Sequence, residues 1–196
     1  EHVRPGAYDP DQRISDMDSD GIHASVLYPN QGAPLFTVPD TDLLNALFVT
    51  YNDYTAEHCA TYPDRLKGLA LINVDDTEWA VRELERAKRL GMSGALIPVY
   101  PPPGKGSHLP QYEPFWYAAQ ELGMPLSLHL GTNRTGSVAE FVDVETLTPE
   151  YFCNYDYWVR LSLTQLILGG VFERFPKLIV GSVENDASWA PYFLWA

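Results

Sequence analysis

Five short stretches of this 196-residue chain are apolar at nearly every position, and segments with helical spacing separate them. The stretches begin near residues 23, 66, 93, 124 and 177. A strand with one face in solvent alternates apolar and polar residues, whereas a strand of a parallel sheet that is covered on both faces is apolar throughout. The pattern therefore predicts an α/β fold in which helices connect parallel strands.

The segments between these stretches carry the signals of helices. Asp40 is placed to cap a helix whose apolar residues follow the three-and-four spacing of one buried face. Gly91 and Gly123 each end a later helix, and Leu-Gly-Met occurs at both junctions, 32 residues apart. That spacing corresponds to one strand-plus-helix unit. A further helix is predicted over residues 156–172, ahead of the last strand.

Two arrangements suit such a sheet, an open doubly wound sheet and a closed eight-stranded barrel. No Gly-x-Gly-x-x-Gly follows a predicted strand, which removes the best evidence for a dinucleotide-binding sheet. Long polar segments at 100–110 and 131–155 instead follow strands, where a barrel builds its active site. A (β/α)8 TIM barrel takes about 250 residues. We therefore expect residues 1–196 to form a single, incomplete barrel domain with pieces missing at both ends.

Composition limits the partners and the compartment. Acidic residues outnumber basic ones by 26 to 13, and the formal net charge of -13 argues against nucleic acid and anionic membranes as partners. Cys59 and Cys153 are too few for a disulfide framework and are expected to be reduced thiols in a cytoplasmic protein. The chain opens without an apolar leader, and its longest apolar stretch, 158–172, contains Arg160 and Gln165. A soluble protein is expected.

Two potential metal ligands close two successive strands. His129 ends the stretch that begins at Met124, and Glu184 directly follows the stretch 177–183. A neutral imidazole and a carboxylate suit a divalent ion such as zinc or manganese. From the residues alone, a core histidine bonded to the backbone is the favoured interpretation of His129. Glu184 can instead orient a ligating ring or cap a helix near Asn185.

Several segments resemble those of the amidohydrolase-related (amidohydrolase 2) family, in the branch typified by aminocarboxymuconate-semialdehyde decarboxylase. They are Asp9-Pro10-x-x-Arg13-Ile14-x-x-Met17-Asp18-x-x-Gly21-Ile22; Asn52 with Pro63-Asp64-Arg65; Glu83-Leu84-Glu85-Arg86-Ala87; Pro125 to His129; and Gly170-Val171-Phe172-Glu173-Arg174-Phe175-Pro176-Lys177-Leu178. The resemblance covers nearly the whole chain. It implies a metal-dependent TIM barrel that decarboxylates, hydrates or hydrolyses small carboxylated compounds, often derived from aromatics.

The resemblance also implies a metal site. It places His129 as the ligand of the fifth strand and Glu184 at the sixth-strand position, where many members have a histidine. The family's first-strand His-x-His pair and its eighth-strand Asp have no counterpart here, so the first and the last two strands of the barrel are expected to be missing. We therefore predict a divalent metal, with zinc ahead of manganese, and weak or no metal binding unless the missing strands are supplied.

Five residues are candidates for substrate binding, and each has a structural alternative. Arg13 lies where related decarboxylases hold a substrate carboxylate, and its alternative is an ion pair with Asp9 or Asp16. Tyr28 and Asn30 end the first stretch, where a turn at Pro29 also accounts for Asn30. Asn133, together with the following arginine, can line the pocket or belong to a solvated loop. Trp189 can wall the pocket or pack beneath the barrel rim.

Two other chemistries are disfavoured. A Schiff-base barrel needs a lysine inside or at the carboxyl end of a strand, yet the four lysines lie at strand beginnings, in a helix and in a loop. Gly-x-Ser-x-Gly, the nucleophile elbow of serine hydrolases, is absent. The sequence thus favours a metal-dependent decarboxylase or hydrolase of a small carboxylated substrate. The resemblance also implies that the protein forms a homodimer. The alternative is a catalytically silent barrel that serves as a subunit or a small-molecule binder.

Overall fold

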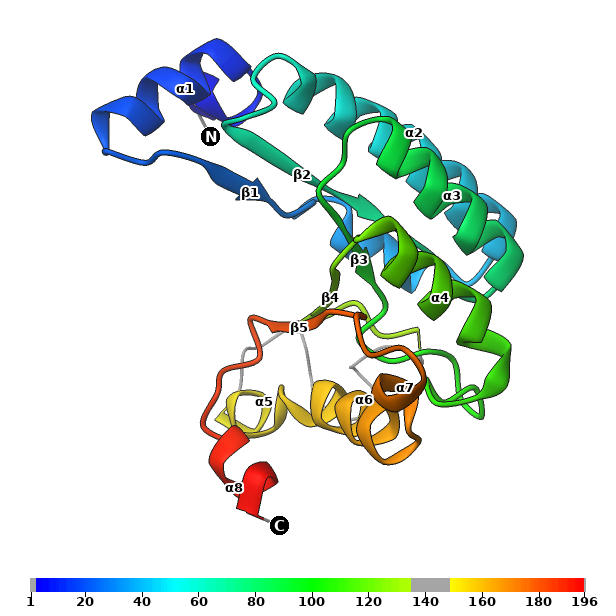
Figure 1. Ribbon diagram of the computed structural model, residues 1–196. Helices are drawn as coiled ribbons and strands as arrows, with labels where there is room; N and C mark the ends of the chain where they lie inside the picture. The colour runs from blue at the N-terminus through cyan, green and yellow to red at the C-terminus, as the bar shows by residue number, and fades with distance from the viewer. Residues whose placement is uncertain (1–2, 135–148, 196) are drawn as a thin grey trace.

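A computed structural model describes residues 3–134 and 149–195 of the chain, and a curved parallel sheet runs through it. Its strands are β1 Ser25–Leu27, β2 Leu66–Leu71, β3 Gly94–Ile97, β4 Leu126–His129 and β5 Val180–Val183. They pair in chain order, each parallel to the next. Figure 1 shows the sheet as an arc with helices α2, α3 and α4 on its outer side. The predicted α/β half-barrel is confirmed.

Helices alternate with the strands along the chain. Those described are η1 Pro5–Ala7, α1 Pro10–Ser19, η2 Ala33–Thr37, α2 Thr41–Ala60, α3 Thr77–Arg89, η3 Pro110–Tyr112, α4 Glu113–Leu122, α5 Pro149–Asn154, α6 Tyr157–Leu168, α7 Val171–Arg174 and α8 Ala190–Trp195. Asp40 caps α2 as predicted, since its carboxylate accepts the Leu43 N–H at 2.9 Å. Gly123 ends α4 with a left-handed φ of 58°.

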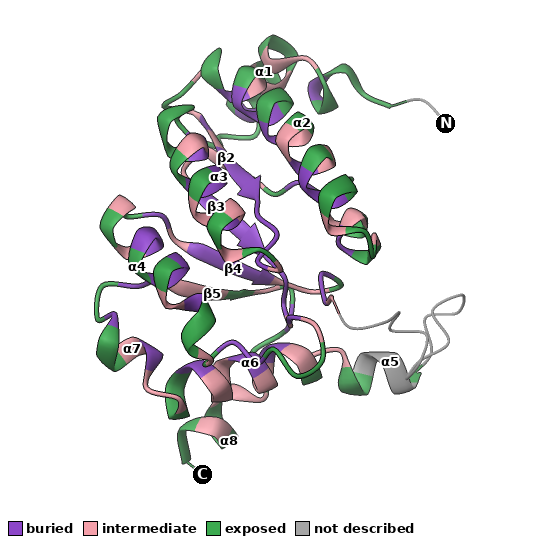
Figure 2. Ribbon diagram, turned by 90° about the vertical axis from the view of Figure 1, so that its right-hand side faces the viewer, coloured by how far each residue is buried: buried purple, intermediate pink, exposed green. Residues whose placement is uncertain are grey.

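The strands differ in how far they are buried. Nearly every residue of β2, β3 and β4 is buried, as expected for parallel strands with two covered faces (Figure 2). The outer face packs against α3 and α4 through Ala70, Ala95 and Leu126, whereas Leu71 and Leu96 pack against Phe36 of η2. The edge strands β1 and β5 are only partly buried. Among residues 3–134 and 149–195, β1 and β5 are therefore the edge strands of the arc, each paired on one side.

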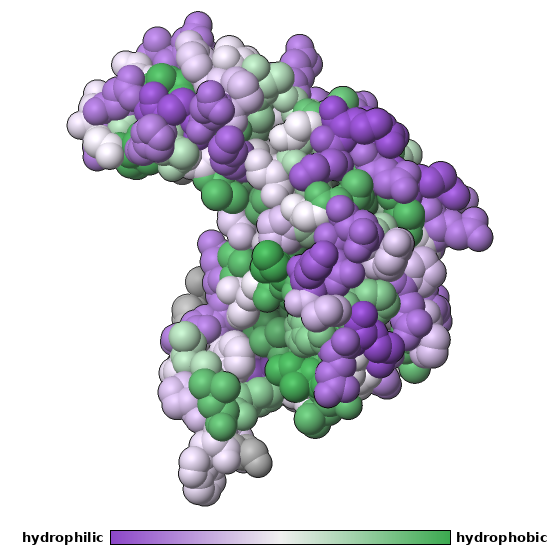
Figure 3. All heavy atoms as spheres, viewed as in Figure 1, coloured by the Kyte–Doolittle hydropathy of each residue, from purple (hydrophilic) through white to green (hydrophobic). Residues whose placement is uncertain are grey.

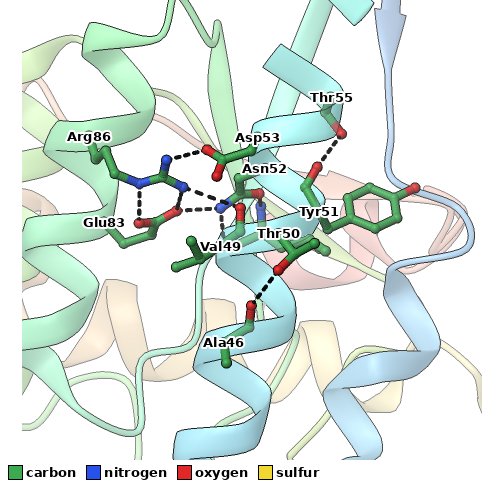
Figure 4. Close-up of polar contacts among 10 residues, drawn as sticks. Ala46, Val49, Thr50, Tyr51, Asn52, Asp53, Thr55, Glu83 and Arg86 are labelled. Carbon is green, nitrogen blue, oxygen red and sulfur yellow. Dashed lines mark hydrogen bonds and ion pairs between the residues drawn. The ribbon is translucent and has the colours of Figure 1, made fainter. Parts of the chain in front are cut away.

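A buried polar cluster fastens α2 to the sheet where β1 and β2 diverge. The Asn52 side chain of α2 accepts the Leu71 N–H at 2.7 Å and donates to the Leu71 carbonyl at 3.0 Å. It also donates to Glu83 of α3 at 2.7 Å, and Glu83 is held in turn by Arg86 (Figure 4). Asn52 thus replaces the strand neighbour that Leu71 lacks on this side.

One predicted helix is split. The apolar segment 156–172 forms α6 and the short α7, separated at Gly169 and Gly170, because Gly170 adopts a left-handed φ of 69°. Around the last strand, large apolar side chains are exposed; they are Ile167, Leu168, Ile179, Tyr192, Leu194 and Trp195. Figure 3 shows a C-shaped outline that is hollow on the side away from α2–α4. None of the helices in the described part of the chain is long and apolar enough to cross a bilayer.

Candidate metal and substrate site

His129 and Glu184 meet at the carboxyl ends of two neighbouring strands. His129 is the last residue of β4, and its Cα pairs with that of Val183, the residue before Glu184. The His129 Nε2 lies 3.3 Å from the Glu184 Oε2. The imidazole is 14% exposed and the carboxylate 68% exposed, so the pair has a buried side and a solvent side. The structure therefore brings together the two side chains that the sequence singles out.

The hydrogen bonding of His129 decides which ring nitrogen faces the carboxylate. Nδ1 lies 2.9 Å from the Leu130 carbonyl oxygen, which can only accept, so Nδ1 carries the proton. In the neutral ring, Nε2 then presents a lone pair to an anionic oxygen. Two electron-rich atoms at this distance are stabilised by a cation between them or by a proton on Nε2. This donor set fits a divalent metal that would be held by Nε2 and the Glu184 carboxylate.

The backbone after β5 is bent to present Glu184. Glu184 and Asp186 have φ values of 59° and 56°, a left-handed conformation that non-glycine residues seldom adopt. Asn185, which lies between them, is buried, and its amide donates to the Val183 and Leu128 carbonyls at 2.7 and 3.2 Å. One side chain thus ties together the strand ends that carry His129 and Glu184, which offsets the cost of the bend.

Tyr28 and Ser127 adjoin the pair on the inner face of the sheet. The Tyr28 ring lies 5.6 Å from the His129 ring, centroid to centroid, and its hydroxyl lies 3.1 Å from the Ser127 Oγ. Ser127 precedes His129 by two residues and so shares its face of β4. The placement of Tyr28 beside His129 is consistent with the predicted role in substrate binding.

Two further hydroxyl groups stabilise the loops around this site. Thr132 is buried; its hydroxyl donates to the His129 carbonyl at 2.8 Å and accepts the Val99 N–H at the same distance. In the segment after β3 the Tyr112 hydroxyl donates to the Lys105 carbonyl at 3.0 Å. Burial raises the pKa of Tyr112 to about 12, so it stays protonated and serves as a donor.

The other candidates for substrate binding lie in different surroundings. Arg13 is on the helix-covered side of β1, where its Nη2 lies 3.4 Å from the Ser25 hydroxyl. Asn30 is exposed in the turn after β1, and Asn133 is buried in the loop after β4. The Trp189 Nε1 donates to the Asn185 carbonyl at 3.0 Å, and its ring packs against Phe193. These four residues are not in direct contact with the His129–Glu184 pair in the contacts described.

The described residues supply two donors of the candidate metal site. Among them, no group of three or more His, Cys, Asp or Glu side chains is placed to hold an ion together. His129 and Glu184 offer two donors, with room for further ligands on the solvent side. Such a pair can polarise a bound oxygen only when the other ligands complete the coordination shell.

Sequence reasoning missed Ser127, Thr132 and Asn185 as parts of this arrangement. Ser127 was within reach, because the period of two along a strand places it on the same face as His129. Asn185 was considered only as a neighbour of a capping carboxylate, and nothing in its sequence context indicates that its amide bridges two strands. Thr132 acts through the carbonyl of a residue three positions earlier, which depends on the loop conformation.

The chain is similar to known decarboxylases over most of its length. A gamma-resorcylate decarboxylase from Polaromonas sp. is 31% identical over 195 residues, and a 2-amino-3-carboxymuconate-6-semialdehyde decarboxylase from Dictyostelium discoideum is 27% identical over 192 residues. These alignments cover 94% and 95% of this chain but 58% and 50% of the relatives. The chain thus spans about half the length of the curated relatives it matches.

A solved structure and a family model agree with these alignments. The structure of a dihydroxybenzoic acid decarboxylase from Polaromonas sp., with bound manganese and the inhibitor 2-nitroresorcinol, superimposes with a TM-score of 0.73 at 28% identity. The superposition covers 94% of this chain and 57% of the decarboxylase chain. The family model described as amidohydrolase matches residues 9–181, which include four of the five strands and the start of the fifth. The chain therefore belongs to the amidohydrolase family.

Proposed function

We propose that this chain is part of a metal-dependent decarboxylase that acts on a small aromatic carboxylate. The observation that carries the proposal is the His129–Glu184 pair, which joins the carboxyl ends of two parallel strands with Nε2 turned toward the carboxylate. That edge is where parallel barrels bind their ligands. The named relatives are decarboxylases, which favours decarboxylation over hydrolysis or hydration.

His129 and Glu184 are the proposed metal ligands. When bound, a divalent ion would polarise a substrate oxygen and lower the energy of charge that develops during carbon–carbon cleavage. An imidazole and a carboxylate suit zinc, as proposed from the sequence, and the manganese in the Polaromonas structure makes manganese the alternative. The protein's own contribution is to fix the two donors: Leu130 holds the His129 ring, and Asn185 holds both strand ends.

The proposed substrate contacts have unequal support. Tyr28 has support from position, because its ring lies beside His129 and its hydroxyl reaches Ser127. Asn30 and Asn133 belong to loops at the same end of the sheet, and Trp189 follows Glu184. Arg13, proposed to hold the substrate carboxylate, is supported by the family resemblance alone, since its guanidinium lies beside Ser25 on the helix side.

The arc is proposed to be part of an eight-stranded barrel in a cytoplasmic homodimer. In the described part of the chain, β1 and β5 each pair with one neighbouring strand, and large apolar side chains are exposed near β5. The first and the last two strands of the barrel would pair with these edges. Sedimentation of this chain alone should then show association; a monomer that unfolds cooperatively would contradict the proposed barrel completion.

Metal analysis and carbon dioxide release test the function. The intact protein should bind zinc or manganese, and it should release carbon dioxide from a hydroxybenzoate. His129→Ala should lower the metal affinity by more than about 100-fold, because loss of a ligand exceeds the effect of losing a residue that only orients one. The control His23→Ala, which changes an exposed histidine before β1, should leave the affinity unchanged. Less than about a tenth of an equivalent of metal, unaffected by His129→Ala, would instead favour the silent barrel.

A further inference from the structure

Arg134 connects the loops that follow the first four strands of the sheet. Its Nε and Nη2 donate to the Asp75 Oδ2 at 2.9 and 2.6 Å, after β2. Its Nη1 donates to the carbonyls of Phe36 and Val38, after β1, at 2.5 Å each. Its backbone N–H donates to the Tyr100 carbonyl, after β3, at 2.8 Å. Arg134 itself lies in the loop after β4.

This ion pair is buried. The Arg134 side chain is 5% exposed and that of Asp75 is 8% exposed. The sequence allowed a solvated loop here; the structure instead encloses the arginine, because loops distant in the sequence converge on it. Burial of two charges is costly unless geometry and hydrogen bonds compensate, so such a pair fixes a conformation more than it adds stability. Since the guanidinium is already bonded on Nε, Nη1 and Nη2, it is unsuited to holding a substrate carboxylate.

The loops that Arg134 fastens are those that frame the candidate site. The segment 28–38 begins with Tyr28, beside His129, and ends at the carbonyls that Arg134 binds. Along this segment Gly32 lies against Leu71: a Cβ there would come within 2.5 Å of the Leu71 Cδ1. The loop 130–134 starts directly after His129. A single guanidinium thus fixes the far ends of both segments that bring Tyr28 and His129 together.

We propose that Arg134 is a positioning residue, which holds the segment 28–38 and the loop 130–134 so that Tyr28 stays beside His129. The positioning follows from the contacts alone, and only its consequence for turnover rests on the proposed function. Because these contacts reach the segments after the strands and not the strands themselves, they distinguish Arg134 from a residue that stabilises the whole fold. Its loss should loosen these loops and leave the strand ladder intact.

Hydrogen exchange with mass spectrometry tests the proposal on the intact protein. In Arg134→Ala, amides in and directly after η2, those of Ala33, Leu35 and Val38, should exchange about tenfold faster, the effect of losing about one net hydrogen bond. Amides of the ladder such as Ala95 and Leu126, bonded to Pro125 and Ile179, should keep their rates once Asp75→Leu is added, while the amides of η2 stay fast. The double variant leaves no unpaired buried charge to lower the global stability. Millimolar guanidinium should restore slow exchange to Arg134→Ala, because it can occupy the vacated site. Arg134→Lys, which keeps the charge without the fork, should be intermediate.

Arg65 provides the matched control. Its guanidinium also binds one carboxylate, of Asp18, and two carbonyls, of Ile22 and His23, but at the amino ends of β1 and β2. Arg65→Ala should therefore speed exchange near Ser25 and leave η2 unchanged. Uniformly faster exchange in the double variant Arg134→Ala/Asp75→Leu, unchanged exchange of η2 in Arg134→Ala, or failure of guanidinium to restore it would overturn the proposal. If Arg134→Ala does not fold, Arg134→Lys and Asp75→Asn test the same point through exchange in η2.

Turnover gives a separate answer. If the wild-type protein decarboxylates a hydroxybenzoate, Arg134→Lys should lower kcat/KM at an unchanged metal content, because the ligands stay while Tyr28 moves. An unchanged kcat/KM together with faster exchange in η2 would show that the loops move without consequence for the reaction, which contradicts the catalytic part of the proposal. If the wild-type protein is inactive on every such acid, the proposed function fails, and the exchange data still decide the role of Arg134.

Discussion

Arg65 and Arg134 make the same kind of contact at opposite ends of the sheet. Each guanidinium binds one carboxylate and two backbone carbonyls. Arg65 joins α1 and the lead into β1 to the start of β2, and its partner Asp18 is 60% exposed. Arg134 joins loops at the carboxyl ends, and its partner Asp75 is 8% exposed. The two arginines thus have the same kinds of partner, but one ion pair is exposed and the other is buried.

The difference follows the division of labour in parallel α/β folds. Contacts at the amino ends of the strands stabilise the fold, whereas the loops at the carboxyl ends carry the ligand site. A solvated ion pair suffices to fasten a helix to a neighbouring strand. Loops from four strands have no ladder to align them, and a buried guanidinium with directed donors fixes them in one arrangement. Variants at both ends of the sheet can test whether loss of the buried ion pair lowers the stability more than loss of the exposed one.

The largest effect is expected at Asp75. Asp75→Leu leaves the Arg134 charge buried without its carboxylate, so the free energy of unfolding should fall by about 3 to 5 kcal/mol. Adding Arg134→Leu should recover much of this loss, because the double variant removes the unpaired charge. Urea unfolding of the two single variants and the double variant measures this. Additive losses would show that the two residues act independently and would contradict a coupled buried pair.

Asn52 tests a buried polar cluster away from the site (Figure 4). Asn52→Ala leaves the N–H and carbonyl of Leu71 without partners, and the free energy of unfolding should fall by about 2 to 3 kcal/mol. Thr50→Ala in the same helix removes only an exposed hydroxyl bonded to the Ala46 carbonyl, and should stay within about 0.5 kcal/mol of the wild type. Equal effects in urea unfolding would show that burial does not govern these contacts.

A small effect is expected at the amino ends. Asp18→Asn removes the exposed partner of Arg65, and the free energy of unfolding should fall by less than about 1 kcal/mol. The loss should shrink further at high salt, since solvent ions screen exposed charges. Urea unfolding at low and high salt measures both points. A loss as large as that of Asp75→Leu would remove the contrast between the two arginines.

The sequence predicted the parts of the fold that depend on local pattern. The strands that contain Ile97 and Leu126 belong to stretches that are apolar at nearly every position, and they lie inside the sheet and are almost wholly buried. The helix cap at Asp40 and the stop at Gly123 were predictable because each acts within a few residues. The break at Gly170 was missed, since apolar periodicity continues across it and the glycine takes a left-handed conformation.

The sequence predicted which candidate residues lie together where they end or follow strands. It did not predict the contacts between loops. His129 and Glu184 were identified because parallel strands in sequence order bring their carboxyl ends together. Arg134 contacts Asp75 and the Phe36 and Val38 carbonyls, which lie far away in the sequence. No local pattern encodes which loops fold onto each other, because that depends on the packed sheet and on the path of each connection.

The smallest effect is expected at His58 in α2, near Arg13 and the amino ends of the strands. Burial, together with the charge of Arg13, lowers the pKa of His58 below its ordinary value of 6.5. The unfolded chain then binds a proton at a higher pH than the folded chain does. His58 therefore contributes no penalty above pH 6.5, and it destabilises the fold increasingly as the pH falls through 6.5.

His58→Gln removes this titration and should flatten the dependence of stability on pH. Urea unfolding at about pH 7.5 and about pH 5.5 should show a smaller loss on acidification for the variant than for the wild type. His23→Gln, at an exposed position, should behave as the wild type does. If His58→Gln loses as much stability on acidification as the wild type does, other titratable groups cause the acid sensitivity. The amino-end region around α1 and α2 would then be tested by salt alone, through the direct but exposed ion pair of Asp18 and Arg65.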